Sequence, residues 1–261
     1  MDLICAAVLL SRDWDLLPRD RSGITGTGDL AALPYQISSY SEAALEYALR
    51  LKEQAAAAGH APVLLAAVLA PELPEVLPQN LYAVEVDRLV HLPVREETLF
   101  SPPDCAELLA GLFAPLGPDL VLTGCQDSTC CGAEGGILLA RRLGLPYYGP
   151  LADLRLEGGR LRLTRTLSRC TQEGSVSGPA VCAMGNCEHP YLRMATLREK
   201  LAVLGRAAER AEPACNTGRG PRLESLAPRQ GGRQFRWLPG DTPEEQAAAL
   251  LALIREKEGT P

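Results

Sequence analysis

The stretch from Pro118 to Pro146 constrains the fold of this chain more than any other part of its sequence. It opens with a short apolar run, Asp119–Thr123, which predicts a strand buried on both faces. Gly124–Cys131 is small and polar, and Gly132–Leu143 then places apolar residues at helical spacing. A strand, a small-residue loop and a helix start present backbone N–H groups and a positive helix end to a phosphate. The pattern therefore predicts a nucleotide site at this loop.

Strands and helices are predicted to alternate along the first 143 residues. Besides the strand above, buried strands are expected at Leu3–Leu10, Ala61–Leu69 and Asp87–Leu92. Helices are expected at Pro103–Phe113 and at Ser41–Ala58, the second of them capped by its own first serine. This alternation predicts an α/β fold with a doubly wound, mainly parallel sheet of the Rossmann-like type that binds adenine nucleotides.

The sequence changes character after residue 150. Short β-like runs are expected at Leu151–Leu156, Arg160–Leu167 and Pro179–Met184, with a hairpin turn at Gly158-Gly159. Leu192–Leu204 has helical spacing. The first two runs flank the turn directly, so this section is expected to be rich in β structure.

The C-terminal part differs again in composition. Glu212–Gln234 is rich in Pro, Gly and Arg and is expected to be an extended arm. A final helix should start near Asp241 or Thr242 as cap, with Pro243 in its first turn. We therefore expect a nucleotide-binding domain at 1–211 and an arm with a closing helix at 212–261.

Composition excludes several classes of protein. The chain has 46% hydrophobic and 22% charged residues, as soluble globular proteins do, and no apolar run approaches the ~20 residues that span a bilayer. The N-terminus lacks a secretory signal, so a cytoplasmic location without membrane insertion is expected. A net charge of −6 argues against a nucleic-acid partner. The arginines of the arm are better explained by contact with an acidic partner subunit.

No set of residues suggests catalysis or metal binding. The nine cysteines contain no C-x2-C pair, and most are expected to be small buried hydrophobes rather than metal ligands. Cys130 or Cys131 could be reactive if it lies at a helix N-terminus, which lowers the thiol pKa. The three histidines are scattered, and hydrolase and Walker motifs are lacking.

Four passages resemble the β subunit of electron transfer flavoprotein, the family called FixA in nitrogen fixers. SEAALEYALRLKE resembles the family's ALEEALRLKE helix, and Asp119–Pro146 matches DLVLxGxQ…G…A…LGLP without a gap. Glu188–Tyr191 resembles the E-P-R-Y turn, and Gly240–Glu258 resembles the closing GDxxEEAAxxLxxLLxEK helix. The four passages occur in the family's order over nearly the whole chain. The resemblance therefore implies that this protein is a divergent paralogue of the family.

The resemblance implies an electron-transfer subunit with no active site of its own. The family's β subunit buries AMP or, in electron-bifurcating members, a second FAD. It pairs as a heterodimer with an α subunit that carries the redox FAD. The C-terminal arm of the β subunit wraps around the FAD-bearing part of the α subunit. The pair takes electrons from a flavin dehydrogenase and passes them to a quinone reductase or another acceptor.

The resemblance also assigns residues to the nucleotide. By position they are Ala7, Ser38, Ser39, Tyr40, Ser41, Leu69, Gly124, Cys125, Gln126, Thr129, Cys130, Cys131, Gly132 and Gly135. Two departures matter: the family's D-G-D-T is replaced by Thr129–Gly132, and its N-P-x-D by Ser38–Ser41. The substitutes are small, so phosphate binding stays possible, but carboxylates that could hold ribose are lost. The alternative is an emptied pocket packed by its own side chains.

The partner-docking segment also departs from the family. Thr166 stands where the family has a glutamate used near its dehydrogenase. Met194, with Tyr191 nearby, stands where a leucine anchors the partner, and methionine fills such pockets adaptably. The alternative is that Met194 faces the core of its own helix. A different function, a free-standing nucleotide binder of the universal-stress type, is disfavoured by the long arm and closing helix.

Overall fold

The computed structural model describes residues 1–13, 33–126, 134–212 and 237–258. Contacts divide the chain into two units, Met1–Leu226 and Ala227–Pro261. Among the described residues, every helix is too short or too polar to cross a lipid bilayer.

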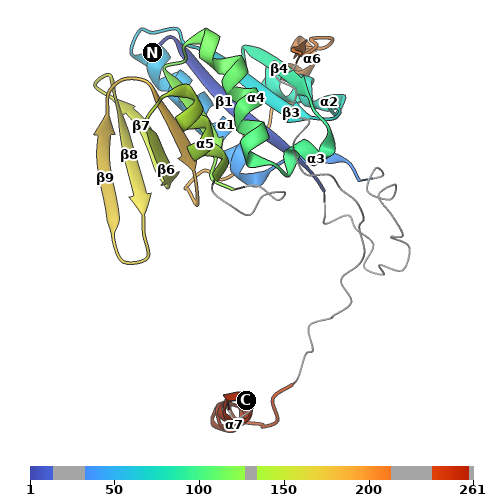
Figure 1. Ribbon diagram of the computed structural model, residues 1–261, viewed down its shortest axis with the longest axis vertical. Coiled ribbons are helices and arrows are strands. Elements are labelled where there is room, and N and C mark those ends of the chain that lie inside the picture. The colour runs from blue at the N-terminus through green and yellow to red at the C-terminus, as the bar shows by residue number, and fades with distance from the viewer. Residues whose placement is uncertain (14–32, 127–133, 213–236, 259–261) are drawn as a thin grey trace. The chain divides into compact units, whose positions relative to one another are not determined.

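Among the described residues, seven parallel strands form the central sheet of the first unit, part of which is labelled in Figure 1. Their order is β11-β4-β3-β1-β5-β10-β6, and a short strand, β2, pairs antiparallel with β1. The strands span Leu3–Arg12 (β1), Tyr35–Ile37 (β2), Val63–Ala70 (β3), Arg88–Pro93 (β4), Leu120–Gly124 (β5), Tyr147–Leu151 (β6), Ala180–Met184 (β10) and Glu209–Arg210 (β11). The predicted α/β fold with a mainly parallel sheet is confirmed.

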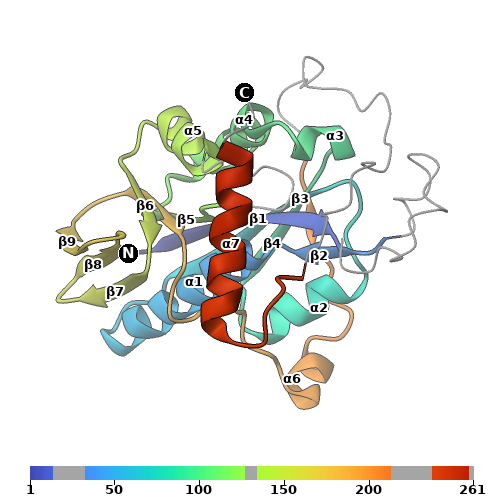
Figure 2. The ribbon, with the colours of Figure 1, turned by 90° about the horizontal axis from the view of Figure 1, so that it is seen from below.

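Helices cover both faces of this sheet (Figure 2). One face carries α1 (Ser39–Ala57) and α2 (Val76–Ala83); the other carries α3 (Glu96–Leu99), α4 (Pro102–Phe113) and α5 (Glu134–Leu143). A 3-10 turn follows α4 at Ala114–Leu116, and α6 (Leu197–Ala202) comes after β10. No helix was predicted between β3 and β4, yet this segment contains α2 because Leu77, Leu81 and Tyr82 bury against the sheet.

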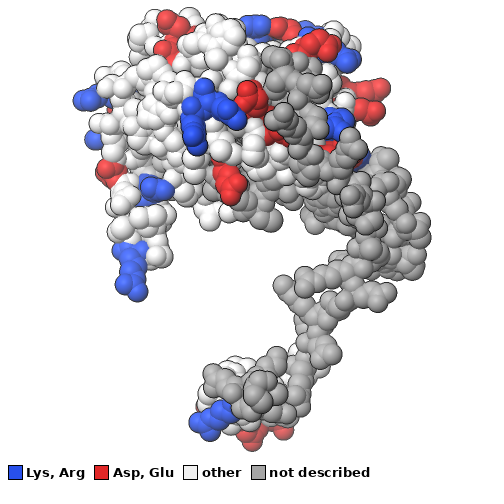
Figure 3. All heavy atoms as spheres, in the orientation of Figure 1, with Lys and Arg blue, Asp and Glu red and all other residues white. Residues whose placement is uncertain are grey.

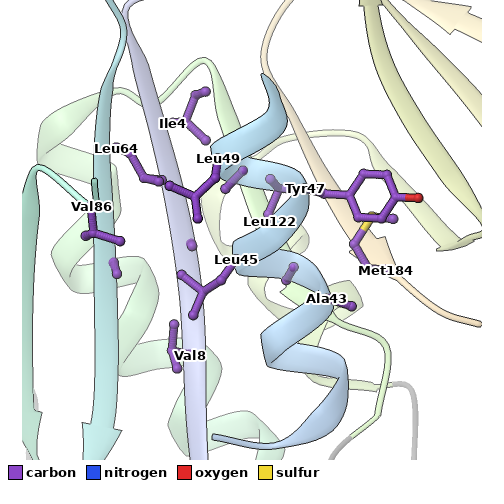
Figure 4. Close-up of a cluster of buried hydrophobic side chains, with 14 of the residues drawn as sticks. Ile4, Val8, Ala43, Leu45, Tyr47, Leu49, Leu64, Val86, Leu122 and Met184 are labelled. Carbon is purple, nitrogen blue, oxygen red and sulfur yellow. The ribbon is translucent and has the colours of Figure 1, made fainter. Parts of the chain in front are cut away.

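Successive residues of β1 enter opposite cores because side chains alternate across a strand. Ile4 and Val8 pack with Leu45 and Leu49 of α1, as Figure 4 shows. Cys5 lies in the cluster formed with α4 and α5. Burial on both faces explains the nearly continuous apolar run that predicted this strand.

A separate antiparallel sheet contains β7 (Asp153–Glu157), β8 (Arg160–Thr166) and β9 (Thr171–Val176). Gly158 and Gly159 join β7 to β8 at φ 56° and 76°, values that suit a two-residue hairpin turn, so the predicted turn is confirmed. The predicted strand Leu151–Leu156 is wrong in its bounds. The cis Gly149–Pro150 bond lies in β6, and the chain then leaves the main sheet for β7.

Two predicted helix starts also differ from the structure. The first helix begins at Ser39, with Ser38 rather than Ser41 at the N-cap position. Ser41 instead accepts a hydrogen bond from the backbone N–H of Leu9 at 3.2 Å. The predicted helix at Leu192–Leu204 shortens to α6, which starts with a capping box between Thr196 and Glu199.

The second unit contains α7 (Pro243–Glu258). Thr242 accepts a hydrogen bond from the N–H of Glu245, whose carboxylate accepts in turn from the N–H groups of Asp241 and Thr242. The predicted start of this helix is therefore confirmed. Glu212 lies at the edge of the described residues, and the rest of the predicted arm, residues 213–234, lies outside them.

Candidate functional site

The direction of the chain along the sheet reverses between β1 and β5. Strands β3 and β4 lie on one side of β1, and the later strands β5, β10 and β6 lie on the other side, in that spatial order. In open α/β sheets, ligands bind at such a switch point, outside the carboxyl ends of the strands.

A cavity of about 40 Å³ lies at this switch point. Its walls come from β1, β5, α4, α5 and the first turn of α1: Ala7, Leu9, Ser41, Cys105, Ala106, Leu109, Thr123, Gly124, Cys125, Gln126, Gly135, Gly136 and Leu139. Six of the residues assigned from the resemblance therefore come together here, namely Ala7, Ser41, Gly124, Cys125, Gln126 and Gly135.

A second, larger hollow shares Cys125 and Gln126 with this cavity. It measures about 380 Å³ and is lined by Tyr40, Cys125, Gln126, Pro150, Leu151, Ala152, Thr166, Gly185 and Asn186. The hydroxyl of Tyr40 donates to Oδ1 of Asn186 at 3.1 Å, which joins the start of α1 to the segment after β10. Thr166 and Asn186 thus border the candidate site, although neither was assigned to it from the sequence.

Tyr40 lines the larger hollow, and three other assigned residues line neither one. Ser38 is buried and donates its hydroxyl to Ser41 Oγ at 2.8 Å, Ser39 is exposed, and Leu69 is wholly enclosed in β3. The remaining four, Thr129, Cys130, Cys131 and Gly132, lie outside the described residues.

Gly124 lets the end of β5 approach the start of α1. A Cβ at this position would lie 2.8 Å from the Cβ of Tyr40 and 2.9 Å from its carbonyl carbon. Because one of these neighbours is backbone, a larger residue could be accommodated only by moving α1. For Gly135, by contrast, the would-be Cβ has no contact within 4 Å with described residues beyond its own helix.

Two described cysteines near the site, one buried and one partly buried, have raised thiol pKa values. Cys125 is 9% exposed, and burial raises its pKa. Burial also raises the pKa of Cys187. Neither is therefore suited to act as a thiolate nucleophile. Within the described ranges, no three His, Cys, Asp or Glu side chains are grouped as metal ligands would be.

Thr123 is a site residue that the sequence analysis did not single out. It was expected only as the last residue of a buried strand, and it is 7% exposed. Its Oγ1 is buried and has no hydrogen-bond partner among the described residues. The available signal was a hydroxyl directly before the glycine of the loop.

The segment between β10 and α6 carries the two residues expected to dock a partner. Met194 is 94% exposed and Tyr191 is 72% exposed. Met194 precedes α6, so the alternative that it faces the core of its own helix is wrong. Arg193, between them, instead points to α1, where it binds Glu46 and Glu53.

On the face shown in Figure 3, the described basic and acidic side chains are scattered and do not form a stripe.

A family model for the electron transfer flavoprotein domain matches residues 29–186, which is more than half of the chain. The chain belongs to the electron transfer flavoprotein family. The electron transfer flavoprotein match contains all the residues that line the two hollows except Ala7 and Leu9. A search of curated proteins found no significant match.

Proposed function

We propose that this chain is a β-like subunit of an electron transfer flavoprotein heterodimer that holds AMP or FAD structurally. The observation that carries the proposal is the convergence of Ala7, Ser41, Gly124, Cys125, Gln126 and Gly135 at the switch point of the sheet. These are six of the positions that the family resemblance assigns to the nucleotide.

The described residues fit such a ligand in chemistry and in space. The inner cavity offers the unpartnered hydroxyl of Thr123 beside Gly135 and Gly136, where backbone can approach a phosphate closely. The adjoining hollow of about 380 Å³ falls within the roughly 300–1,000 Å³ range of small-molecule sites. In this proposal, Tyr40, Gln126 and Asn186 contact the nucleoside part.

The partner would be an α-like subunit that carries the redox FAD. Two features support this partnership: family membership, and the apolar side chains Leu250, Leu251 and Ile254, each about half exposed on α7. The exposed Met194 supports the docking of a dehydrogenase. We assign residues 212–261 to contact with that subunit. The pair would take electrons from a flavin dehydrogenase and pass them to a quinone reductase or another acceptor, and this chain would have no active site of its own.

The test is co-expression of the full chain with its α-like partner, followed by denaturation of the purified complex and identification of every nucleotide released. We expect a yellow heterodimer that releases one FAD from the α-like subunit and one AMP or FAD from this chain. A stable, colourless monomer that does not bind the α-like subunit would contradict the proposed heterodimer. A complex that releases a single FAD and nothing else would contradict the nucleotide site.

A further inference from the structure

The buried hydroxyl of Thr123 lowers the stability of the folded chain unless it forms a hydrogen bond. Thr123 is in the middle of the sheet, where β5 pairs with β1 and β10, and its Oγ1 has no partner among the described residues. A buried polar group without a hydrogen bond destabilises the folded state. Valine has nearly the same shape and would fill this position without that cost.

This hydroxyl faces the first turn of α5. A Cβ on Gly136 would lie 2.9 Å from Thr123 Oγ1 and 2.9 Å from Cε2 of Tyr147, so the glycine keeps the space in front of the hydroxyl open. Gly135 and Gly136 both line the cavity, at the start of a ten-residue helix. The first four N–H groups of a helix have no acceptor within it, and that end of the helix is positive.

The size and charge of the cavity limit what can bind there. At about 40 Å³ it has room for one small group, and its described lining residues include no charged side chain. Its described polar donors are neutral, and they include the hydroxyl of Thr123 and the amides at the start of α5. Neutral donors at a helix N-terminus are suited to phosphate oxygens. The shared walls at Cys125 and Gln126 would let the rest of a ligand continue into the larger hollow.

We propose that Thr123 is a phosphate-binding residue whose hydroxyl donates a hydrogen bond to a phosphate oxygen of the bound nucleotide at the start of α5. The inference rests on the proposed nucleotide site and adds to it a side chain that selects phosphorylated ligands. It accounts for a hydroxyl in β5 that the fold itself does not need.

The test compares Thr123→Val with Thr123→Ser in the nucleotide-free full chain, by calorimetric titration with AMP and with adenosine. A hydrogen bond to a charged group corresponds to a loss of about 10-fold or more in affinity. We expect Thr123→Val to lose that factor for AMP and less than about 2-fold for adenosine, which has no phosphate. Thr123→Ser keeps the hydroxyl and should bind AMP nearly as tightly as the original chain. If FAD binds in place of AMP, riboflavin serves as the matched ligand without the pyrophosphate.

A second measurement separates phosphate binding from a structural role. Without nucleotide, Thr123→Val should unfold at the same temperature as the original chain or at a higher one, because it removes an unsatisfied buried hydroxyl. A lower unfolding temperature, or an equal loss of affinity for AMP and adenosine, would overturn the inference. So would unchanged AMP affinity in Thr123→Val, which indicates a hydroxyl satisfied by a buried water. If the original chain binds neither AMP nor FAD, the proposed nucleotide site fails as well.

Discussion

Arg193 binds the buried carboxylate of Glu46, which lies 147 residues earlier in the chain. Its Nη2 is 2.9 Å from Glu46 Oε1 and its Nε is 3.0 Å from Oε2, so the contact is bidentate. Arg50 approaches Oε1 of the same carboxylate at 2.9 Å, and Glu53 binds the outer side of Arg193. The pair therefore fixes the segment that carries Tyr191 and Met194 to the side of α1.

Removing Arg193 should destabilise the fold strongly. Arg193→Met leaves Glu46, which is 3% exposed, with much of its charge uncompensated, and such losses cost about 3–5 kcal/mol. Glu53 is more than half exposed, so Glu53→Gln is the matched control and should cost about 1 kcal/mol or less. Urea unfolding of the full chain measures both. Equal losses for the two variants would contradict the role given to the buried pair.

Acid should weaken the fold through these carboxylates. Burial opposes ionisation of Glu46, but the hydrogen bonds from Arg193 and Arg50 outweigh it and hold its pKa below the usual value. The hydrogen bond from Arg12 likewise lowers the pKa of Glu96. The folded chain thus binds fewer protons than the unfolded chain at these sites.

The stability that these carboxylates contribute is therefore complete above the unfolded pKa of about 4.3 and is lost as the pH falls through the lower folded values. Urea midpoints measured from pH 6 to pH 2.5 should decline below about pH 4. Glu46→Gln lacks one of the titrating groups and should decline less steeply. An identical slope in that variant would exclude Glu46 as a source of the acid sensitivity.

Asp119 joins the starts of two neighbouring strands. Its Oδ2 accepts hydrogen bonds from the backbone N–H groups of Asp2 at 2.6 Å and Leu3 at 3.1 Å. Asp119→Ala should therefore cost about 1–3 kcal/mol in the free energy of unfolding, because it removes an ionised acceptor of two donors. Asp2→Ala is the control, because that side chain is 99% exposed. Comparable unfolding curves for the two variants would exclude this role for Asp119.

Gly124 and Gly135 should respond in opposite ways to alanine. At Gly124 the added methyl group would meet Tyr40 at 2.8 Å and displace the start of α1, which should lower the unfolding temperature and weaken nucleotide binding. At Gly135 the methyl group meets no described residue beyond its own helix within 4 Å, and alanine favours a helix by about 0.5–1 kcal/mol. Differential scanning calorimetry should give a lower midpoint for Gly124→Ala and an equal or higher one for Gly135→Ala.

Met194 should matter for binding and not for folding. It is 94% exposed, so Met194→Ala should change the free energy of unfolding by less than about 0.5 kcal/mol. If it anchors a dehydrogenase, the variant heterodimer should accept electrons from that dehydrogenase with a KM raised about tenfold, which corresponds to one lost anchor of ~1.4 kcal/mol. Steady-state reduction of the complex measures the change, and an unaltered KM would remove Met194 from the interface.

Local patterns in the sequence determined most of the central sheet. The apolar runs at β1, β3 and β5 predicted strands because side chains buried on both faces must be apolar at every position. The glycine pair between β7 and β8 predicted its turn because both positions need positive φ. In each case, the information lies within about ten consecutive residues.

The tertiary structure decided the features that depend on distant residues. No local pattern indicates that Glu46 meets Arg193 or that Ser41 binds the end of β1. Nor does any local pattern indicate that Thr123 Oγ1 is buried without a partner among the described residues. The segment Val76–Ala83 forms α2 because its apolar side chains bury against the sheet. Sequence periodicity determines which face of an element is buried, whereas the partners of a polar group depend on chain segments that only folding brings together.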